Sequence, residues 1–248
     1  MTEPFKNLLN PTLVRACSAA LTKAWPALDR KHFERTALKD LDALEMKARA
    51  MQIADALEAA LPPDFDAACR VIEAALAPPV AIDGVASAHD GEGLAGWVVW
   101  PLGEFVARRG LEQPERALRV LHALTQRLTA EWAIRPLIVA HPELVFDTLL
   151  AWTRDPSPHV RRLASEGSRP RLPWGLQLKT LIADPSPTLP ILAALQDDDS
   201  AYVRRSVANH LNDIAKDHPQ LVVDWVRRHL PDASVERRAL LSHASRTL

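Results

Sequence analysis

The octapeptide Asp155-Pro-Ser-Pro-His-Val-Arg-Arg162 recurs 43 residues later, with changes, as Asp198-Asp-Ser-Ala-Tyr-Val-Arg-Arg205. Each copy begins with turn-forming residues, continues with one apolar anchor and ends on two adjacent arginines. A spacing of about 40–47 residues is typical of HEAT-like helical-hairpin repeats. Stacked repeats place equivalent residues side by side, so the arginine pairs should be neighbours on one surface that can hold a long polyanion. The repeat predicts an all-α, HEAT-like helical-repeat solenoid with a concave basic face.

The composition agrees with this prediction. Leu and Ala dominate the 248 residues, and no stretch alternates apolar and polar residues as a strand does. The two cysteines, Cys17 and Cys69, lack metal-ligand spacing, so we expect no metal and no cofactor. No signal peptide and no apolar run of about 18 residues occurs. We expect a single domain over residues 1–248, in the cytoplasm, without a membrane segment or an obligate protein partner.

The charge distribution favours one anion-binding surface. A net charge of −1 by itself argues against a nucleic-acid-binding protein. Residues 39–93, however, contain 4 Lys/Arg and 11 Asp/Glu, a balance of −7, whereas residues 154–179 contain 6 and 2, a balance of +4. A basic middle in a neutral chain suits a polyanion-facing surface. The alternative is ordinary scatter of surface charge.

Turn and cap signals divide the chain into helices. Asn10-Pro11 is an N-cap followed by proline at the first helical position. The motifs that begin at Asp155, Asp184 and Asp198 each predict a helix start, because short Asp or Ser side chains accept from exposed amides. We expect helices over residues 38–61, 67–76, 97–109, 113–137 and 142–152, with residues 77–96 as the longest loop.

The helix that starts near Ser200 carries two stripes. Val203, Val207, Leu211 and Ile214 form an apolar stripe for the core. A second stripe, shifted by two positions, is wholly polar: Arg205, Asn209, Asp213 and Lys216. Such a stripe is usually a solvated face with favourable ion pairs. Asn209, Asn212 and Asp213 in mid-helix nevertheless lower helix propensity, which favours a role other than stability.

Two further clusters are candidates for a site. Ser168-Arg-Pro-Arg-Leu-Pro-Trp-Gly175 is a loop in which prolines can hold Trp174 rigidly exposed for stacking, or in which the indole packs beneath the loop. Upstream, Arg127, Glu131 and Arg135 are spaced four residues apart. That spacing fits an intrahelical ion-pair ladder or a catalytic anion held between arginines.

Four stretches carry a family resemblance. Thr129-Ala-Glu-Trp-Ala-Ile-Arg-Pro136, Val160-Arg-Arg-Leu-Ala-Ser-Glu-Gly-Ser-Arg-Pro-Arg-Leu-Pro-Trp-Gly175 and Tyr202-Val-Arg-Arg-Ser-Val-Ala-Asn-His-Leu-Asn-Asp-Ile-Ala-Lys-Asp217 resemble the bacterial DNA alkylation-repair glycosylases of the AlkC/AlkD family, AlkC branch. Leu44-Glu-Met-Lys-Ala-Arg49 resembles another stretch of that family. Some members carry an immunoglobulin-like module after the helical region, and we expect residues 1–248 to lack it.

The resemblance implies an activity and its residues. It implies a DNA-3-methyladenine glycosylase that excises cationic alkylpurines from double-stranded DNA in base excision repair, in the bacterial cytoplasm at the nucleoid, without flipping the base. The implied catalytic residues are Glu131, Trp174 and Asp213, and Glu166 is a lesser candidate for a site anion. The implied DNA-binding residues are Arg135, Arg161, Arg162, Arg169, Arg171, Arg204, Arg205 and Lys216.

Elementary chemistry agrees with this expectation. Alkylation at purine N3 places positive charge on the base and makes it a good leaving group. The remaining barrier is charge development on the deoxyribose, which a fixed carboxylate stabilises while it orients or deprotonates water.

One alternative is a non-catalytic HEAT-like protein that binds DNA structure, although such a protein would not need the carboxylates and the tryptophan. Another is a protein-interaction scaffold, which predicts an apolar concave groove where the repeat supplies arginines.

Overall fold

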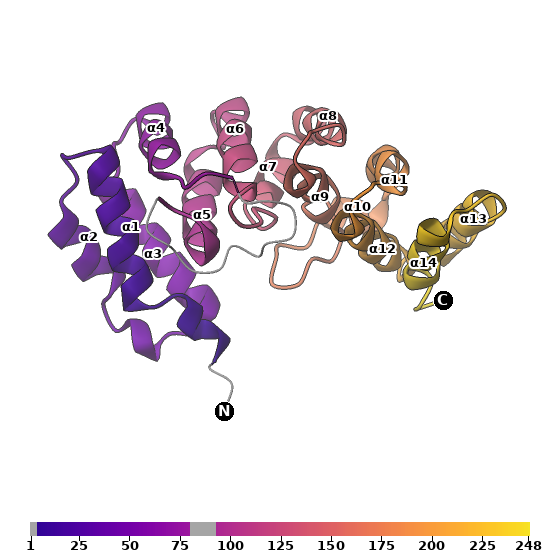
Figure 1. The fold of residues 1–248 in the computed structure, drawn as a ribbon, viewed down its shortest axis with the longest axis horizontal. Helices are drawn as coiled ribbons and strands as arrows, with labels where there is room; N and C mark the ends of the chain where they lie inside the picture. The colour runs from indigo at the N-terminus through magenta and orange to yellow at the C-terminus, as the bar shows by residue number, and fades with distance from the viewer. Residues whose placement is uncertain (1–3, 80–92) are drawn as a thin grey trace. The chain divides into compact units, whose positions relative to one another are not determined.

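The structure, a computed structural model, describes residues 4–79 and 93–248 and is helical throughout these ranges (Figure 1). Only one isolated bridge, between Leu76 and Leu94, interrupts the helical pattern of the described residues. The chain divides into two compact units, Met1–Ile134 and Arg135–Leu248, which we describe one at a time. Residues 80–92 of the predicted long loop lie outside the described residues. The predicted all-α class is confirmed, and the concave basic face stays a prediction.

The N-terminal unit stacks its helices in two layers, with α3 on α5 and α4 on α6. Asn10 caps α1 as predicted, because its side chain accepts a hydrogen bond from the amide of Leu13. The helices of this unit are α1 Pro11–Ala24, α2 Arg30–Ala37, α3 Met46–Ala60, α4 Phe65–Ala75, α5 Val99–Arg109 and α6 Pro114–Thr125, with short 3₁₀ turns at Phe5–Leu8, Leu41–Ala43 and Gly96–Val98.

A buried arginine explains why residues 38–61 are not one helix, as the sequence had led us to expect. Asp40 adopts a left-handed conformation, a 3₁₀ turn follows, and α3 begins only at Met46. Arg49 is 2% exposed and donates to the carbonyl oxygens of Leu44 at 2.9 Å and Asp42 at 3.2 Å. Carbonyls that a longer helix would have paired are thus satisfied by one guanidinium. The stretch that carries the N-terminal resemblance has this structural role.

The second expected long helix, over residues 113–137, is also interrupted. α6 ends at Thr125, and α7 begins at Ile134 and runs to Ala140. Arg127 folds back, donating to the carbonyl oxygens of Ala123 at 2.8 Å and Ala77 at 2.7 Å. Arg127, Glu131 and Arg135 therefore do not lie on one helix. The alternative of an intrahelical ion-pair ladder was wrong.

The C-terminal unit repeats a helical hairpin. α9, α12 and α14 stack in one layer, and α8, α11 and α13 cover them in a second layer (Figure 1). Val203, Val207, Leu211 and Ile214 are all buried, which confirms the apolar stripe of α12. The bounds are α8 Pro142–Trp152, α9 Pro158–Glu166, α10 Lys179–Ala183, α11 Leu189–Leu195, α12 Ala201–Ala215, α13 Pro219–His229 and α14 Val235–Ala244, with a 3₁₀ turn at Ser186–Thr188.

The same turn recurs before α9, α11 and α12. A side-chain oxygen of Asp155, Asp184 and Asp198 accepts from the amide of the serine two residues later, at 2.8, 3.0 and 2.9 Å respectively. The first arginine of each pair, Arg161 or Arg204, donates to the carbonyl oxygens five and six residues before it. The repeated octapeptide thus predicts its own turn correctly, and one of its two arginines closes that turn.

Both cysteine side chains are buried. Burial raises the pKa of both Cys17 and Cys69 to about 12, so both thiols are neutral at physiological pH. Among residues 4–79 and 93–248, no three His, Cys, Asp or Glu side chains gather as a metal site would require. None of the described helices combines the length and the apolar character that crossing a membrane would need.

Candidate active site and nucleic-acid interface

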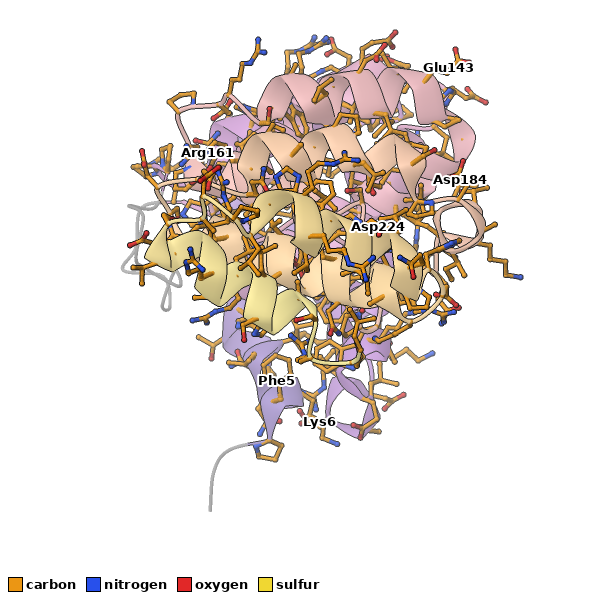
Figure 2. The ribbon with its side chains drawn as sticks, turned by 90° about the vertical axis from the view of Figure 1, so that its right-hand side faces the viewer. Phe5, Lys6, Glu143, Arg161, Asp184 and Asp224 are labelled. Atoms are coloured by element: carbon orange, nitrogen blue, oxygen red, sulfur yellow. The ribbon has the colours of Figure 1, made fainter. Side chains whose placement is uncertain are left out.

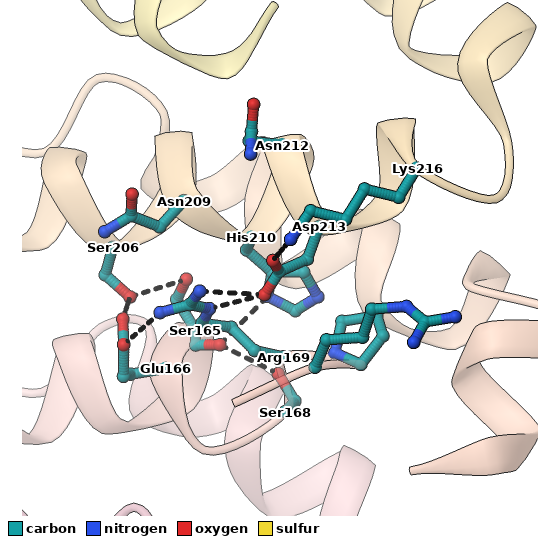
Figure 3. A network of polar contacts seen from close by, with 12 residues as sticks. Ser165, Glu166, Ser168, Arg169, Ser206, Asn209, His210, Asn212, Asp213 and Lys216 are labelled. Carbon is teal, nitrogen blue, oxygen red and sulfur yellow. Dashed lines mark hydrogen bonds and ion pairs between the residues drawn. The ribbon is translucent and has the colours of Figure 1, made fainter. Parts of the chain in front are cut away.

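A network of buried charges joins α12 to α9 and the loop that follows it (Figure 3). Asp213 is 2% exposed and accepts from Arg169 at 2.8 Å. The same guanidinium donates to Glu166 at 2.6 Å, and this carboxylate is also buried. Arg169 therefore bridges the two carboxylates and fixes the position of each. Arg169 is thus buried and engaged with these two partners, and the expectation that it binds DNA stays a prediction.

Glu166 stays ionised although it is buried. Burial favours the neutral acid, but Arg162 and Arg169, together with the hydroxyl of Ser206 at 2.6 Å, outweigh it and hold the pKa of Glu166 below its ordinary value. Arg162 lies 3.5 Å from the carboxylate and over the ring of Tyr202. Removing one partner of such a buried set is strongly destabilising. Glu166 is thus placed to orient Arg169.

A neutral histidine lies against this network. His210 is fully buried, and its Nδ1 lies 2.9 Å from the carbonyl oxygen of Ser165, which requires the proton on Nδ1. Burial lowers the pKa of His210 to about 4. The imidazole is therefore uncharged at physiological pH and does not add a further cation beside the two carboxylates.

Lys216 covers Asp213 on its outer side. Its ammonium donates to the second carboxylate oxygen at 2.9 Å, and its side chain is 44% exposed (Figure 3). A lysine on a long stem exchanges partners readily, whereas the buried Arg169 is fixed by two carboxylates. The Asp213 carboxylate is therefore held between the buried Arg169 and the partly exposed Lys216.

The loop of residues 167–178 presents Trp174 to solvent. Trp174 is 59% exposed and has a φ of 61°, a left-handed conformation that is uncommon for a bulky residue. The alternative of an indole packed beneath the loop is thereby excluded. Backbone strain of this kind persists only where the surroundings enforce it, and it gathers at functional sites. The predicted exposure of Trp174 is confirmed.

Arg135 enforces the shape of this loop. It is fully buried, and its guanidinium donates to the carbonyl oxygens of Leu176 at 2.5 Å, Gly167 at 2.9 Å and Pro170 at 3.4 Å. Gly175 lies against it, so that an added Cβ would approach the Arg135 side chain to 3.3 Å. Arg135 was expected to contact DNA, and that expectation was wrong because its donors face the loop carbonyls.

We expect Arg135→Met to lower the free energy of unfolding by about 3 kcal/mol, because buried carbonyls lose a charged donor. Urea unfolding followed by circular dichroism measures this change. Arg154→Met is the matched control, since Arg154 is exposed in the same unit, and it should change stability by less than about 0.5 kcal/mol. Equal stabilities for the two variants would contradict the anchoring role of Arg135.

The other predicted DNA-binding arginines divide into two groups. Arg161 pairs with Asp198 at 2.6 Å, and Arg204 closes its own turn, so these two have structural duties that the sequence analysis did not foresee. Arg205 is exposed, Arg171 is partly exposed and paired with Asp217 at 2.9 Å, and Arg162 lies at the edge of the network. These three and Lys216 remain the candidates for phosphate contacts.

Glu131 belongs to the N-terminal unit. It is 7% exposed, lies in the turn between α6 and α7, and accepts a hydrogen bond from the hydroxyl of Thr129 at 2.6 Å. The neighbouring Trp132 stacks on Trp100, with ring centroids 4.5 Å apart. These contacts fix the turn that carries the carboxylate. That Glu131 and Asp213 converge on one deoxyribose stays a prediction.

The mid-helix asparagines have a different role from the one expected. Asn209 accepts from His243 at 2.8 Å, and Asn212 accepts from Thr247 at 2.8 Å. Both therefore fasten the C-terminal segment to α12, away from the network (Figure 3).

The sequence analysis also missed Ser206 and His210. These polar residues lie one turn apart beside the apolar stripe, and that spacing was the available signal.

Comparisons with known proteins show which proteins this chain is similar to. The family model for DNA alkylation repair enzymes matches residues 127–248. The uncharacterized protein YhaZ of Bacillus subtilis (strain 168) is 35% identical over 238 residues, which is 90% of this chain and 62% of that protein. The alkylpurine DNA glycosylase AlkC of Pseudomonas fluorescens, solved bound to DNA containing an abasic site analog, is 34% identical with a TM-score of 0.85. That match covers 99% of this chain and 65% of AlkC, so the chain spans less than two thirds of either relative.

Proposed function

We propose that the chain is a DNA glycosylase of the AlkC/AlkD family, because its residues 127–248 match the family model for DNA alkylation repair enzymes and because it is similar to the alkylpurine DNA glycosylase AlkC. It hydrolyses the N-glycosidic bond of cationic alkylpurines in double-stranded DNA, 3-methyladenine foremost, and so starts base excision repair in the cytoplasm. The observation that carries the proposal is the carboxylate of Asp213, one oxygen of which pairs with the buried Arg169 and the other with Lys216, whose side chain is 44% exposed.

The reaction needs little from the protein besides a fixed anion. When the bond between C1′ and the alkylated purine breaks, its electrons pass to the cationic base, which leaves neutral. Positive charge develops on the sugar, and a preorganised carboxylate stabilises it. Water then adds to C1′ and gives its proton to a carboxylate. Glu131 and Asp213 are the two groups that we assign to these tasks.

Lys216 and Trp174 complete the proposed site. The side chain of Lys216 is 44% exposed, so a DNA phosphate can bind its ammonium and draw it away from Asp213. Trp174 is exposed on its loop and can contact the sugar or the lesion from outside the helix stack. Contact from the surface supports excision without base flipping, in contrast to glycosylases that extrude the base.

Phosphate contacts should come from Arg205, which is exposed, and from Arg162 and Arg171, which are partly exposed. Arg162, Arg171 and Arg205 lie on or beside α9 and α12, and none of them closes a repeat turn. Such contacts fix the register of the protein on DNA without reading sequence. A non-catalytic protein that binds DNA structure by its backbone is the second candidate, and the same arginines would serve it.

Release of bases from methylated DNA tests the proposal. We expect the protein, incubated with methylated genomic DNA, to release free 3-methyladenine and to leave abasic sites in an intact backbone. Chromatography with mass spectrometry identifies the released bases, and a reaction without protein gives the spontaneous loss. DNA binding in a mobility-shift assay without any base released above that background would favour the non-catalytic candidate.

A further inference from the structure

A cavity of about 910 Å³ lies in the C-terminal unit between the end of α7, the start of α8 and α10. Its apolar lining includes Val139, Phe146 and Leu176, and Val139 and Leu176 are 60% and 52% exposed. Exposed apolar side chains gathered around a cavity mark a binding surface, whereas single ones are ordinary. We call this surface, with its rim residues Glu143 and Asp147, the α7–α8 groove.

The rim of the groove is acidic. Glu143, Asp147 and Asp184 line it, against a single cation, Lys179. Hydrogen bonds from the backbone amide and the hydroxyl of Ser186 lower the pKa of Asp184, so this carboxylate is ionised at physiological pH. Glu143 and Asp184 lie on one side of the unit and Arg161 on the other (Figure 2). An excess of negative charge repels DNA, so this groove is not part of the proposed nucleic-acid interface.

The two carboxylates on α8 are spaced so that both can pair with cations on a second helix. Glu143 and Asp147 are four residues apart, which places them about 6 Å apart along the helix axis. Neither of these two carboxylates takes part in an ion pair within residues 4–79 and 93–248. Lysines or arginines four residues apart on a second helix repeat at the same distance. A helix laid beside α8 can therefore pair both carboxylates while its apolar face contacts Val139 and Phe146.

We propose that the α7–α8 groove binds a cationic amphipathic helix of a partner protein. The apolar face of that helix fills the cavity, and its Lys or Arg side chains pair with Glu143 and Asp147. Charge complementarity selects this occupant over an acidic or neutral helix. Leu176 also belongs to the loop of residues 167–178, so a bound helix contacts the segment that carries Trp174. The proposal does not depend on glycosylase activity.

A designed peptide tests the groove with the full chain. The probe is a fluorescently labelled helix of about 14 residues, with leucines at positions i, i+3, i+4 and i+7 and lysines four residues apart beside them. Fluorescence anisotropy should give a Kd of about 10–100 µM. The control peptide carries glutamates in place of the lysines and should bind at least about tenfold more weakly because it meets the acidic rim.

Two variants locate the binding. Val139→Glu introduces a charge at an exposed apolar position and should weaken the lysine peptide at least about tenfold. Glu143→Lys should weaken the lysine peptide and strengthen the glutamate peptide. Both variants should release 3-methyladenine as the parent does, so failure of the groove and failure of the glycosylase are separate results. A Kd above about 1 mM for the lysine peptide, equal binding of both peptides, or unchanged binding to Val139→Glu overturns the proposal.

Discussion

Asp213→Asn is expected to slow the release of 3-methyladenine by about 10²–10³-fold while the protein stays folded. The substitution keeps the shape of the side chain and removes its charge. Arg169 retains Glu166 as a partner at 2.6 Å, so the buried guanidinium is not left without an anion. Lys216 loses its partner but is exposed and can be solvated. The sugar, however, no longer meets a fixed negative charge as its own positive charge develops.

Single-turnover assays with protein in excess over methylated DNA measure this effect apart from DNA affinity. Asp217→Asn is the matched control, because Asp217 is exposed, lies four residues later and also pairs with an arginine, Arg171. It should release base within about threefold of the parental rate. Circular dichroism verifies that both variants fold. A parental rate for Asp213→Asn would remove this residue from the chemistry.

Glu131→Gln should lower the rate of base release by about 10²-fold or more. The glutamine oxygen can still accept from Thr129, so the turn between α6 and α7 keeps its hydrogen bond of 2.6 Å. Only the charge is lost, and with it the stabilisation of the sugar or the activation of water. The measurement is the same single-turnover assay, with thermal unfolding to verify the fold.

Glu115→Gln provides the comparison in the same unit, because Glu115 is exposed in the first turn of α6. It should leave the rate within about threefold of the parental value. If Glu131→Gln and Asp213→Asn both excise at the parental rate, the two-carboxylate mechanism is wrong. If only one of them does, the remaining carboxylate performs both tasks.

The sequence predicts the repeats well because their signals are local. A side-chain oxygen of Asp155 or Asp198 contacts an amide two residues away, so spacing alone reveals the turn. The apolar stripe of α12 is equally local. Long helices were predicted wrongly where a distant group intervened: Arg127 reaches Ala77, which helix periodicity does not encode.

For the residues of the candidate site, the sequence indicated local exposure better than it indicated which distant residues they contact. The exposure of Trp174 followed from its proline-rich loop, but nothing in the spacing showed that Arg135 is buried beneath the same loop. Arg169 and Asp213 are 44 residues apart, so their contact depends on how α9 packs against α12. An arginine count therefore overestimates the exposed basic surface, because buried arginines such as Arg135 and Arg169 bind carbonyls and carboxylates instead.

The two arginines of each repeated pair have different structural roles, and this difference has a consequence for protein engineering. Since Arg161 and Arg204 fasten the turns, their neighbours Arg162 and Arg205 are the positions at which each repeat can be redesigned. Arg205 is exposed and can be exchanged for other residue types, whereas Arg162 also neutralises Glu166 and tolerates fewer replacements. New binding specificities should therefore be easier to install on α12 than on α9.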